Sequence, residues 1–236
     1  MLSKWHVHAE GYAQQLINTG KVKITAVWDD DIQRGSDWAK KLGVDFESDL
    51  EKLLARSDVD AVICDTPTTM HAKVLVAAAK AGKHIFTEKA MAPTVAECNQ
   101  IAQAVKNSGV TFVISLPQRG TSVVQFAKKL IAKGDFGKIS LIRIRNGHNG
   151  VSGNWLPAYW FEEKDAAGGS MMDLGCHPMY TLAYLLGKPK RVTGLFNAPF
   201  GSKVDESGIS AIEFDNGEIG IAETSFITYN TPGAVE

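Results

Sequence analysis

Hydrophobic residues gather in short runs along the first half of the chain, and each run is followed by a segment with helical spacing. The runs are rich in Val, Ile, Phe and Thr, which is typical of buried strands, and they lie at 23–29, 59–67, 83–89 and 110–116. The helical segment at 94–109 begins at Thr94, a good N-cap residue, and ends at Gly109. Strands that alternate with helices predict right-handed βαβ crossovers and a parallel sheet.

The pattern changes near residue 117. After a further helical segment, apolar and basic residues alternate with a period of two at 138–148, as in a strand with one covered face. The last hydrophobic stretch predicts a hairpin that turns at 215–217, with the sequence Asp-Asn-Gly. We therefore predict an α/β domain with a parallel sheet and then an α+β domain with a mostly antiparallel sheet, at 1–117 and 118–236.

Both ends of the chain lack an element that this pattern requires. A doubly wound domain begins with a buried strand, whereas the first residues, MLSKWHVHAEGY, resemble the loop that follows one. The last residues, SFITYNTPGAVE, predict a strand without an evident partner. We therefore expect the first strand to be absent and the second domain to be incomplete.

The composition narrows the range of functions. Lys and Arg total 25 against 26 for Asp and Glu, a net charge of −1, and no basic cluster favours nucleic acid. Cys64, Cys98 and Cys176 are far apart, which predicts free thiols in a reducing compartment and neither disulfides nor a structural zinc site. No apolar run reaches the roughly 20 residues of a membrane-spanning helix, and the start lacks the pattern of a signal peptide. We expect a cytoplasmic protein.

Candidate ligand-binding residues follow the predicted strands, at the edge where ligands bind open parallel sheets. Asp29 ends the first run, where an acid can accept hydrogen bonds from the adenosine ribose hydroxyls. Asp30 and Asp31 would repel a 2′-phosphate, and no arginine is closer in sequence than Arg34, so the pattern favours NAD over NADP. The three acids also suit the start of the next helix, and this alternative stays open.

The glycine fingerprint of dinucleotide-binding proteins, G-x-G-x-x-G, is absent from the start of the chain. Backbone N–H groups at the start of the following helix could still hold a pyrophosphate. The residues that stand in the place of the fingerprint are Ser3, Lys4, Trp5 and His6.

Two later strand ends also carry polar residues. The stretch Thr66-Pro67-Thr68 ends one strand, and His71 follows it in a helix; these residues either line a cofactor site or form an N-cap and a surface histidine. Glu88 and Lys89 end the next strand. A lysine there can hold the reacting oxygen of a substrate, and the alternative is an exposed ion pair, which contributes little to stability.

The stretch GGSMMDLGCHPMY, at 168–180, contains a second kind of candidate. Asp173 and His177 are four residues apart, so a continuous helix presents both on one face. Histidine titrates near neutrality and can take a hydroxyl proton, while the aspartate orients the imidazole or binds a second hydroxyl. Two ligands without a third at a suitable spacing do not predict a metal site. The alternative is a helix-to-core hydrogen bond.

Together these blocks resemble the glucose–fructose oxidoreductase and inositol dehydrogenase family, the Gfo/Idh/MocA group. The resemblance extends from Asp29 through TPTTMHAKVLVAAAKAGKHIFTEKA to AAGGSMMDLGCHPMYTLAYLLG. It implies an N-terminal Rossmann domain and a C-terminal domain built on a large, mostly antiparallel sheet. It also implies an enzyme that moves hydride between a nicotinamide cofactor, NAD, and a sugar, polyol or related carbonyl.

The resemblance implies roles for individual residues. Lys89 falls on the lysine of the family's Glu-Lys-Pro motif, near nicotinamide and substrate. Asp173 and His177 fall on the family's Asp-x-x-x-His pair, with His177 as the acid/base. The cofactor-binding residues that follow from the strand ends and the resemblance are Ser3, Trp5, His6, Asp29, Thr66, Pro67, Thr68, His71, Glu88 and Lys89.

The chain departs from the family pattern at two positions besides the glycine fingerprint. Ala90 replaces the proline of Glu-Lys-Pro, whose peptide bond is often cis in this family, and Tyr180 stands where many members carry a second acid. The substrate therefore stays open. Aromatic faces beside polar groups suit a sugar or equally a packed loop, and they occur here at His148, Asn149, Trp155, Tyr159 and Trp160.

Three hypotheses for function follow. The first is an NAD-dependent oxidoreductase in which Lys89 polarises the substrate oxygen, His177 exchanges its proton and Asp173 fixes His177 or the substrate. The second is NAD-assisted glycoside cleavage by transient oxidation on the same scaffold. The third is a non-catalytic member that has lost dinucleotide affinity. By family analogy, the exposed face of the second sheet predicts a homodimer or homotetramer.

Overall fold

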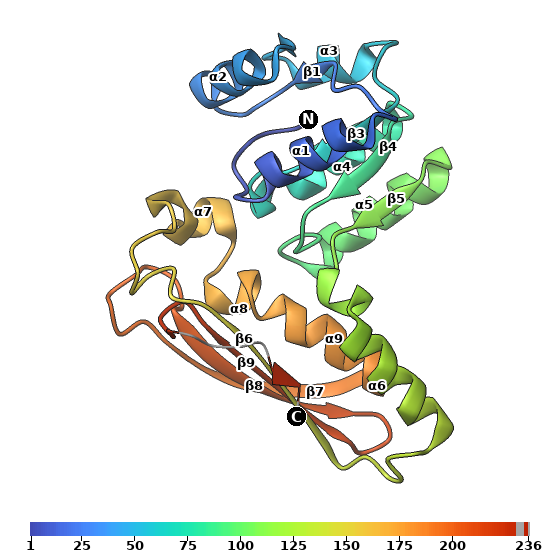
Figure 1. Cartoon of the computed structure of the whole chain (residues 1–236), viewed down its shortest axis with the longest axis vertical. Helices are drawn as coiled ribbons and strands as arrows, with labels where there is room; N and C mark the ends of the chain where they lie inside the picture. The colour runs from blue at the N-terminus through green and yellow to red at the C-terminus, as the bar shows by residue number, and fades with distance from the viewer. Residues whose placement is uncertain (230–233, 236) are drawn as a thin grey trace. The chain divides into compact units, whose positions relative to one another are not determined.

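The chain forms two compact units, Met1–Ser115 and Leu116–Glu236, in a computed structural model that describes residues 1–229 and 234–235 (Figure 1). The elements of the first unit are α1 (Ala9–Thr19), β1 (Ala26–Val27), α2 (Ile32–Leu42), β2 (Asp45–Phe46), α3 (Leu50–Ala55), β3 (Ala61–Cys64), η1 (Thr68–Met70), α4 (His71–Lys80), β4 (His84–Thr87), α5 (Val95–Ser108) and β5 (Phe112–Ile114). Those of the second unit are η2 (Pro117–Gly120), α6 (Ser122–Lys133), β6 (Leu141–Gly147), η3 (Ala158–Phe161), α7 (Glu163–Ala166), α8 (Ser170–Asp173), α9 (Cys176–Leu186), β7 (Pro189–Asn197), β8 (Ser207–Phe214), β9 (Ile219–Ser225) and β10 (Ala234–Val235).

A parallel sheet forms the middle of the first unit. β3, β4 and β5 pair in this order, and β1 pairs with β2. Leu2 lies between β1 and β3, because it bridges Trp28 on one side and Cys64 on the other. Its N–H donates to the carbonyl of Ile63 at 2.8 Å, and its carbonyl accepts from the N–H of Asp65 at 2.8 Å. On the other side, the N–H of Trp28 donates to the carbonyl of Met1 at 3.0 Å, and the N–H of Ser3 donates to the carbonyl of Trp28 at 2.6 Å. Residues 1–3 therefore hold the place of the first strand, which we expected to be empty.

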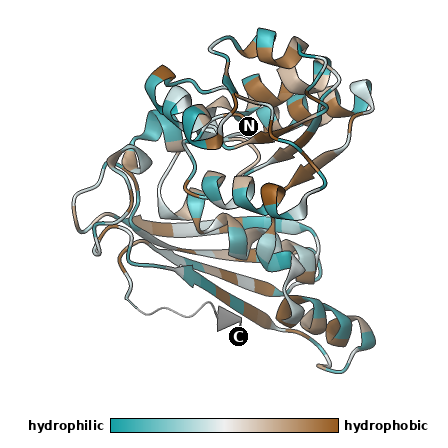
Figure 2. Cartoon of the chain, turned by 45° about the horizontal axis from the view of Figure 1, so that its top comes forward, coloured by the Kyte–Doolittle hydropathy of each residue, from teal (hydrophilic) through white to brown (hydrophobic). Residues whose placement is uncertain are grey.

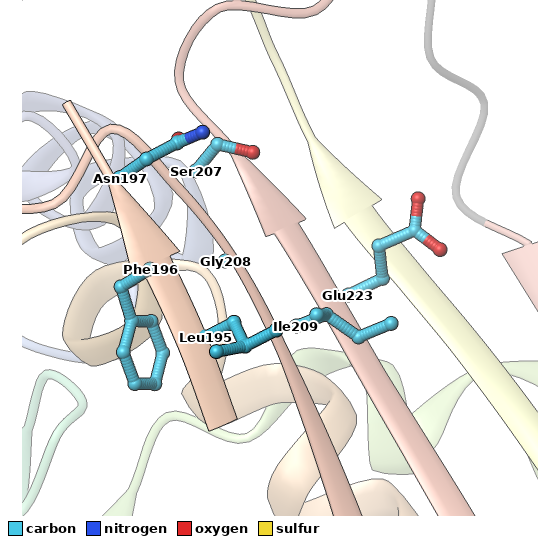
Figure 3. A pocket seen from close by; sticks show the side chains of 7 residues that line it. All are labelled: Leu195, Phe196, Asn197, Ser207, Gly208, Ile209 and Glu223. Carbon is cyan, nitrogen blue, oxygen red and sulfur yellow. The ribbon is translucent and has the colours of Figure 1, made fainter. Parts of the chain in front are cut away.

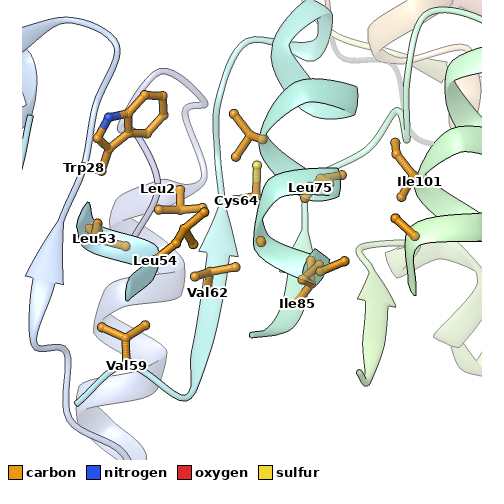
Figure 4. Packing of buried hydrophobic residues seen from close by; sticks show 14 of the residues in the cluster. Leu2, Trp28, Leu53, Leu54, Val59, Val62, Cys64, Leu75, Ile85 and Ile101 are labelled. Atoms are coloured by element: carbon orange, nitrogen blue, oxygen red, sulfur yellow. The ribbon is translucent and has the colours of Figure 1, made fainter. Parts of the chain in front are cut away.

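Alternating side chains on these strands produce two hydrophobic layers, one on each face of the sheet. Val62 and Cys64 of β3 pack with Leu75 of α4, in a cluster that also includes residues of α3 and α5 (Figure 4). Ile63, between them in sequence, packs on the other face with Trp38 of α2 and residues of α1. Helices thus cover both faces, and the predicted Rossmann-type architecture is confirmed.

Local sequence sets the limits of the helices. At the start of α5, the Thr94 side chain accepts from the N–H of Glu97, and the Glu97 side chain accepts from the N–H of Thr94, so the two form a capping box. Gly109 ends this helix with a φ of 67°, which glycine adopts without strain. Asp31 caps α2 by accepting from the N–H of Arg34. These helix ends agree with the prediction because they depend on neighbouring residues alone.

The second unit is built on a five-stranded sheet with the order β10-β6-β9-β8-β7. β6 and β9 run parallel, whereas the other neighbours run antiparallel, so the predicted antiparallel character is confirmed with one parallel pair. β8 and β9 form the predicted hairpin, and Gly217 in its turn has a φ of 90°. Residue 234 begins a short strand on β6, while 230–233 and 236 lie outside the described residues.

The two faces of this sheet differ in their surroundings. α8 and α9 lie over one face (Figure 1), where Leu182 of α9 packs with Phe214 of β8. The hydrophobic colour alternates with polar colour along the strands in Figure 2, as expected for a sheet with unlike faces. On the other face, the side chains of Leu195 and Ile209 are exposed, by 78% and 42% (Figure 3).

Among residues 1–229 and 234–235, no helix has the length and apolar character that crossing a membrane requires.

Candidate functional site

The first unit gathers its polar candidates at the carboxyl ends of parallel strands. Asp29 follows β1, Asp65 and Thr66 follow β3, and Glu88 and Lys89 follow β4. The segment 3–6 follows Leu2, between β1 and β3. Because these strands are parallel, their carboxyl ends lie at one edge of the sheet, where ligands bind in open α/β sheets. The sequence-predicted cofactor residues are thus brought to a common edge.

Asp29 is buried and fully engaged by donors of its own chain. Its Oδ2 accepts from the N–H of Lys4 at 2.8 Å and from Nε of Arg34 at 3.1 Å. Its Oδ1 accepts from the N–H of Asp31 at 3.0 Å and from Nη2 of Arg34 at 2.5 Å. Arg34 is the nearest arginine in the sequence, and the first turn of α2 brings its guanidinium onto the Asp29 carboxylate.

Glu88 is the centre of a second buried network. Its Oε1 accepts from Nδ1 of His8 at 2.9 Å and from the hydroxyl of Tyr12, and its Oε2 accepts from the N–H of Lys89 at 2.9 Å. Burial by itself would raise the pKa of Glu88, but the hydrogen bonds from His8 and Tyr12 and the charge of Lys89 lower it below its ordinary value. Glu88 is therefore an anion held inside the unit, unlike the exposed ion pair considered from sequence.

Ligand atoms of His6, His8 and Glu88 lie within 4.8 Å of one another, which is the spacing of a potential metal cluster. The N–H of His8 donates to Nδ1 of His6 at 3.2 Å, so the neutral His6 ring carries its proton on Nε2. Nε2 is the His6 atom that faces Glu88, at 3.8 Å. Binding of a metal there would move that proton to Nδ1 and remove the hydrogen bond, so the arrangement suits a hydrogen-bond network better than a metal centre.

His71 links two strand ends from the inside. Its Nε2 lies 3.2 Å from the carbonyl of Thr66, and its Nδ1 lies 2.8 Å from that of Ala90 and 3.2 Å from that of Met91. Burial lowers the pKa of His71, and the backbone carbonyls that face its ring oppose this effect. The surface histidine considered from sequence is wrong, because α4 packs this ring between the two loops. The peptide bond between Lys89 and Ala90 is cis.

The remaining cofactor candidates of the first unit are also buried. Ser3, Trp5 and His6 have at most 4% of their surface exposed, and Thr66, Thr68 and Lys89 at most 7%; Pro67 is buried as well. Sequence reasoning missed Asp65, whose two carboxylate oxygens have no hydrogen-bond partner in the part of the chain that the structure describes. Burial and the charge of Glu88 raise the pKa of Asp65 well above its ordinary value. The signal available was an acid directly after the apolar run VIC.

The catalytic candidates of the second unit lie in the segment that begins at Gly168 and Gly169. The carboxylate of Asp205 accepts from the N–H of Gly169 at 3.0 Å, the hydroxyl of Ser170 at 2.8 Å and the N–H of Met171 at 2.8 Å. A Cβ on Gly169 would lie 2.0 Å from the backbone oxygen of Asp205. Glycine is therefore required where these two segments meet, and Asp205 caps α8 from a distant part of the sequence.

The continuous helix that we predicted through Asp173 and His177 is interrupted. α8 ends at Asp173 and α9 begins at Cys176. A Cβ on Gly175 would lie 2.2 Å from Sδ of Met171, so this glycine allows the tight passage between the two helices. The spacing of four residues therefore does not place the pair on one regular helix face, and their positions depend on the break.

Asp173 and His177 each have a hydrogen-bond partner within the second unit. Nε1 of Trp160 donates to Oδ2 of Asp173 at 3.2 Å. Nδ1 of His177 lies 2.8 Å from the hydroxyl of Tyr180, which accepts from the N–H of Gln118 at 3.1 Å. The hydroxyl oxygen can accept a second hydrogen bond, from the N–H at Nδ1, and in that tautomer a neutral His177 carries its lone pair on Nε2. Tyr180 can thus fix the tautomer of His177.

Three of the substrate candidates contact one another. The His148 ring stacks on Phe226 with centroids 5.2 Å apart and lies 4.7 Å from the Trp155 ring, and Nε1 of Trp155 donates to Oδ1 of Asn149 at 3.1 Å. Tyr159 and Trp160 lie in η3. Trp155 remains half exposed, whereas Trp160 is buried against Asp173. Substrate contact by these residues stays a prediction.

Comparisons with known proteins cover both units. Residues 6–116 match the model of an oxidoreductase family with an NAD-binding Rossmann fold, and residues 124–235 match the C-terminal domain of the same Gfo/Idh/MocA family. The chain is 30% identical over 85% of its length to the 2,7-anhydro-N-acetylneuraminate hydratase of Escherichia coli, of which it spans 54%. It is 30% identical over 86% of its length to the NAD-dependent scyllo-inositol 2-dehydrogenase of Bacillus subtilis, of which it spans 59%.

Among solved structures, a levoglucosan dehydrogenase in complex with NADH and levoglucosan superposes with a TM-score of 0.78 at 25% identity, over 89% of this chain and 60% of that one. The chain thus spans between half and two thirds of these three relatives. The two family matches lie in the order expected from the fold and together include nearly all of the described residues. The chain belongs to the Gfo/Idh/MocA family of oxidoreductases.

Proposed function

We propose that the protein binds NAD at the carboxyl edge of its parallel sheet and transfers hydride between the nicotinamide and a hydroxyl or carbonyl carbon of a sugar or polyol. The observation that carries the proposal is the match of an NAD-binding family model to residues 6–116, whose strand ends present Asp29, Glu88 and Lys89 together. The names of two relatives, a levoglucosan dehydrogenase and a scyllo-inositol dehydrogenase, support a polyhydroxylated ring as substrate.

In this proposal the residues of the chain orient the substrate and move one proton. Bound NAD supplies the hydride acceptor when an alcohol is oxidised. The ammonium of Lys89 holds the substrate oxygen, and Nε2 of His177, deprotonated for this direction, takes the hydroxyl proton as hydride leaves the carbon. Asp173 fixes the substrate or the imidazole. The alcohol loses one hydride and one proton, so the products are a carbonyl compound, NADH and a protonated His177.

The proposal is tested by titration of the protein with NADH and NADPH, followed by nicotinamide fluorescence. We expect saturable binding with NADH preferred, and then NADH formation from NAD with at least one substrate in a panel of levoglucosan, D-xylose and scyllo-inositol. Failure of both dinucleotides to bind would contradict the proposal. Binding without turnover of any ring polyol would instead support the non-catalytic alternative.

A second candidate is a reaction without net oxidation, and the hydratase among the relatives favours it. Hydration adds water and leaves the cofactor in its starting form, so no NADH accumulates. Mass spectrometry of an anhydro sugar incubated with protein and NAD separates the two functions. A product heavier by one water without NADH formation supports the hydratase reaction, and a product lighter by two hydrogens with NADH supports the dehydrogenase.

We further propose that copies of the chain associate through the face of the second sheet that no described helix covers. This face presents Leu195 and Ile209 around a hollow of about 410 Å³ (Figure 3). Glu223 lies beside them and forms ion pairs of 2.8 Å with Arg143 and Arg145. Hydrophobic residues with a few charges at their border are typical of interfaces between identical subunits.

Replacement of Leu195 by Glu is expected to separate the copies. Burying a carboxylate in an apolar contact is costly, so light scattering should give the mass of one chain, 25.5 kDa, where the unchanged protein gives a multiple. Val95→Glu is the matched control, because Val95 on α5 is also 78% exposed. A monomeric unchanged protein would contradict the proposal.

A further inference from the structure

Two polar side chains follow the hydrophobic residues on the helix-covered face of the second sheet. Ile144 of β6 pairs with Ala222 of β9, and both are buried in the core that the sheet forms with α9. Two residues farther along these strands, and therefore on the same face, Asn146 pairs with Thr224. Polar side chains on a covered face need hydrogen-bond partners, and these two find different ones.

Thr224 is satisfied inside the protein. Its side chain is buried, and its hydroxyl donates to the carbonyl of Ser170 at 3.0 Å. Ser170 is the first residue of α8, so this hydrogen bond ties the start of the helix to β9. With 1% of its surface exposed, Thr224 has no room for contact with a ligand and acts on the helix alone.

Asn146 contacts the interruption between α8 and α9. Its Nδ2 donates to the carbonyl of Leu174 at 3.2 Å, and the same carbonyl accepts from the N–H of His177 at 3.1 Å. Leu174 directly follows Asp173, so this carbonyl belongs to the backbone that joins the two catalytic candidates. Because a carbonyl oxygen only accepts, the amide must direct its NH₂ group there, and this fixes the orientation of Oδ1.

The Oδ1 atom of Asn146 remains open as an acceptor. It accepts from no residue within the described part of the chain, and the side chain is half-buried rather than enclosed. A fixed acceptor of this kind is suited to a hydroxyl group, which can donate one hydrogen bond, and a sugar or polyol presents several of them. Neighbouring Thr224, which shares the sheet face, offers no such open atom.

We propose that Asn146 is a further residue of the substrate site and accepts a hydrogen bond from one hydroxyl group of the sugar or polyol, other than the hydroxyl that is oxidised; this inference rests on the proposed function. The same amide holds the Leu174 carbonyl, so the recognised hydroxyl is placed relative to Asp173 and His177. Asn146 thereby helps to select which carbon of the ring reaches the nicotinamide.

The experiment compares kcat and KM for the unchanged protein, Asn146→Ala and Thr224→Val. The substrates are the panel sugar with the highest turnover and those of its monodeoxy analogues that are still oxidised. Thr224→Val is the matched control, because it removes the hydrogen bond to α8 at the paired position without reaching a ligand. Circular dichroism checks that each variant is folded, and Asn146→Val replaces Asn146→Ala if that variant is not.

We expect Asn146→Ala to lower kcat/KM for the complete sugar by about tenfold, as the loss of a hydrogen bond to the substrate predicts. For the one analogue that lacks the recognised hydroxyl, the unchanged protein and the variant should agree within about twofold, because the contact is then missing from both. Thr224→Val should change kcat/KM by a similar factor for the sugar and all analogues. NADH affinity, from fluorescence titration, should stay within about twofold in both variants.

The dependence on the analogue separates substrate contact from support of the helices. If Asn146→Ala has no effect, or lowers kcat/KM by one factor for the sugar and every analogue, the inference is overturned. Turnover of the panel sugar by the unchanged protein would still support the proposed function in that case. An unchanged protein that oxidises no panel sugar would contradict the proposed function, and the inference falls with it.

Discussion

Replacement of His177 by Ala is expected to lower turnover by about 10²–10⁴-fold, the usual contribution of a positioned acid/base, while the affinity for NADH stays within about twofold. The two effects are expected to differ because the residues responsible for them belong to different units. His177 belongs to the second unit, whereas the predicted contacts of the dinucleotide belong to the first. Steady-state turnover with the best substrate of the panel and NADH fluorescence titration measure the two effects separately.

Two further variants make this result specific. Tyr180→Phe removes the hydroxyl that lies 2.8 Å from Nδ1 of His177 and leaves the imidazole in place. We expect a smaller loss of turnover and a changed pH profile, because the tautomer of His177 is no longer fixed. His84→Ala, an exposed histidine on β4, is the control and should retain turnover. Equal losses of turnover and NADH affinity in His177→Ala would contradict the acid/base role.

Replacement of Gly169 by Ala is expected to destabilise the second unit and to lower turnover together. The added Cβ would lie 2.0 Å from the backbone oxygen of Asp205, so the two segments must separate and the Asp205 caps on α8 are lost. Overpacking of this kind costs about 1–3 kcal/mol, and each hydrogen bond lost adds about 0.5–1.5 kcal/mol. Asp173, at the end of α8, would move with the helix.

Gly168→Ala is the matched control for this prediction. Its Cβ would meet only Met172, at 3.0 Å from Cβ, so a shift of a few tenths of an ångström relieves the contact, far less than the 2.0 Å approach at Gly169 requires. We expect a change of less than about 1 kcal/mol in the free energy of unfolding. Urea denaturation followed by circular dichroism, with turnover measured alongside, compares the two variants. Equal stability of the two would show that the close approach to Asp205 is not required.

The sequence identified the residues at the strand ends more reliably than their partners. Asp29, Glu88 and Lys89 were predicted at one edge, and the parallel sheet brings them there. The partners of Asp29 were not foreseen, because a contact between Lys4 and Asp29 joins residues 25 positions apart. For the same reason, the sequence left open whether His71 is a surface histidine, although its ring contacts the carbonyl of Ala90, 19 positions away.

The segment around Asp173 and His177 shows the same limit. A spacing of four residues predicts a common helix face only while the helix is continuous. The helix is interrupted between Asp173 and Cys176, where a Cβ on Gly175 would lie 2.2 Å from Sδ of Met171. Asp205, which caps α8, comes from the loop between β7 and β8. Periodicity within the segment contained no information about that loop.

The sequence by itself determined the order of strands and helices, the helix ends at Thr94 and Gly109, and the hairpin at 215–217. These features depend on side-chain periodicity and on caps and turns between residues that are close in the chain. Tertiary structure alone decided that Leu2 lies between β1 and β3, that Arg34 donates hydrogen bonds to Asp29, and that the helix is interrupted before His177. These outcomes depend on which distant backbone groups and charges meet when the chain packs, and the need to satisfy buried polar groups then fixes their partners.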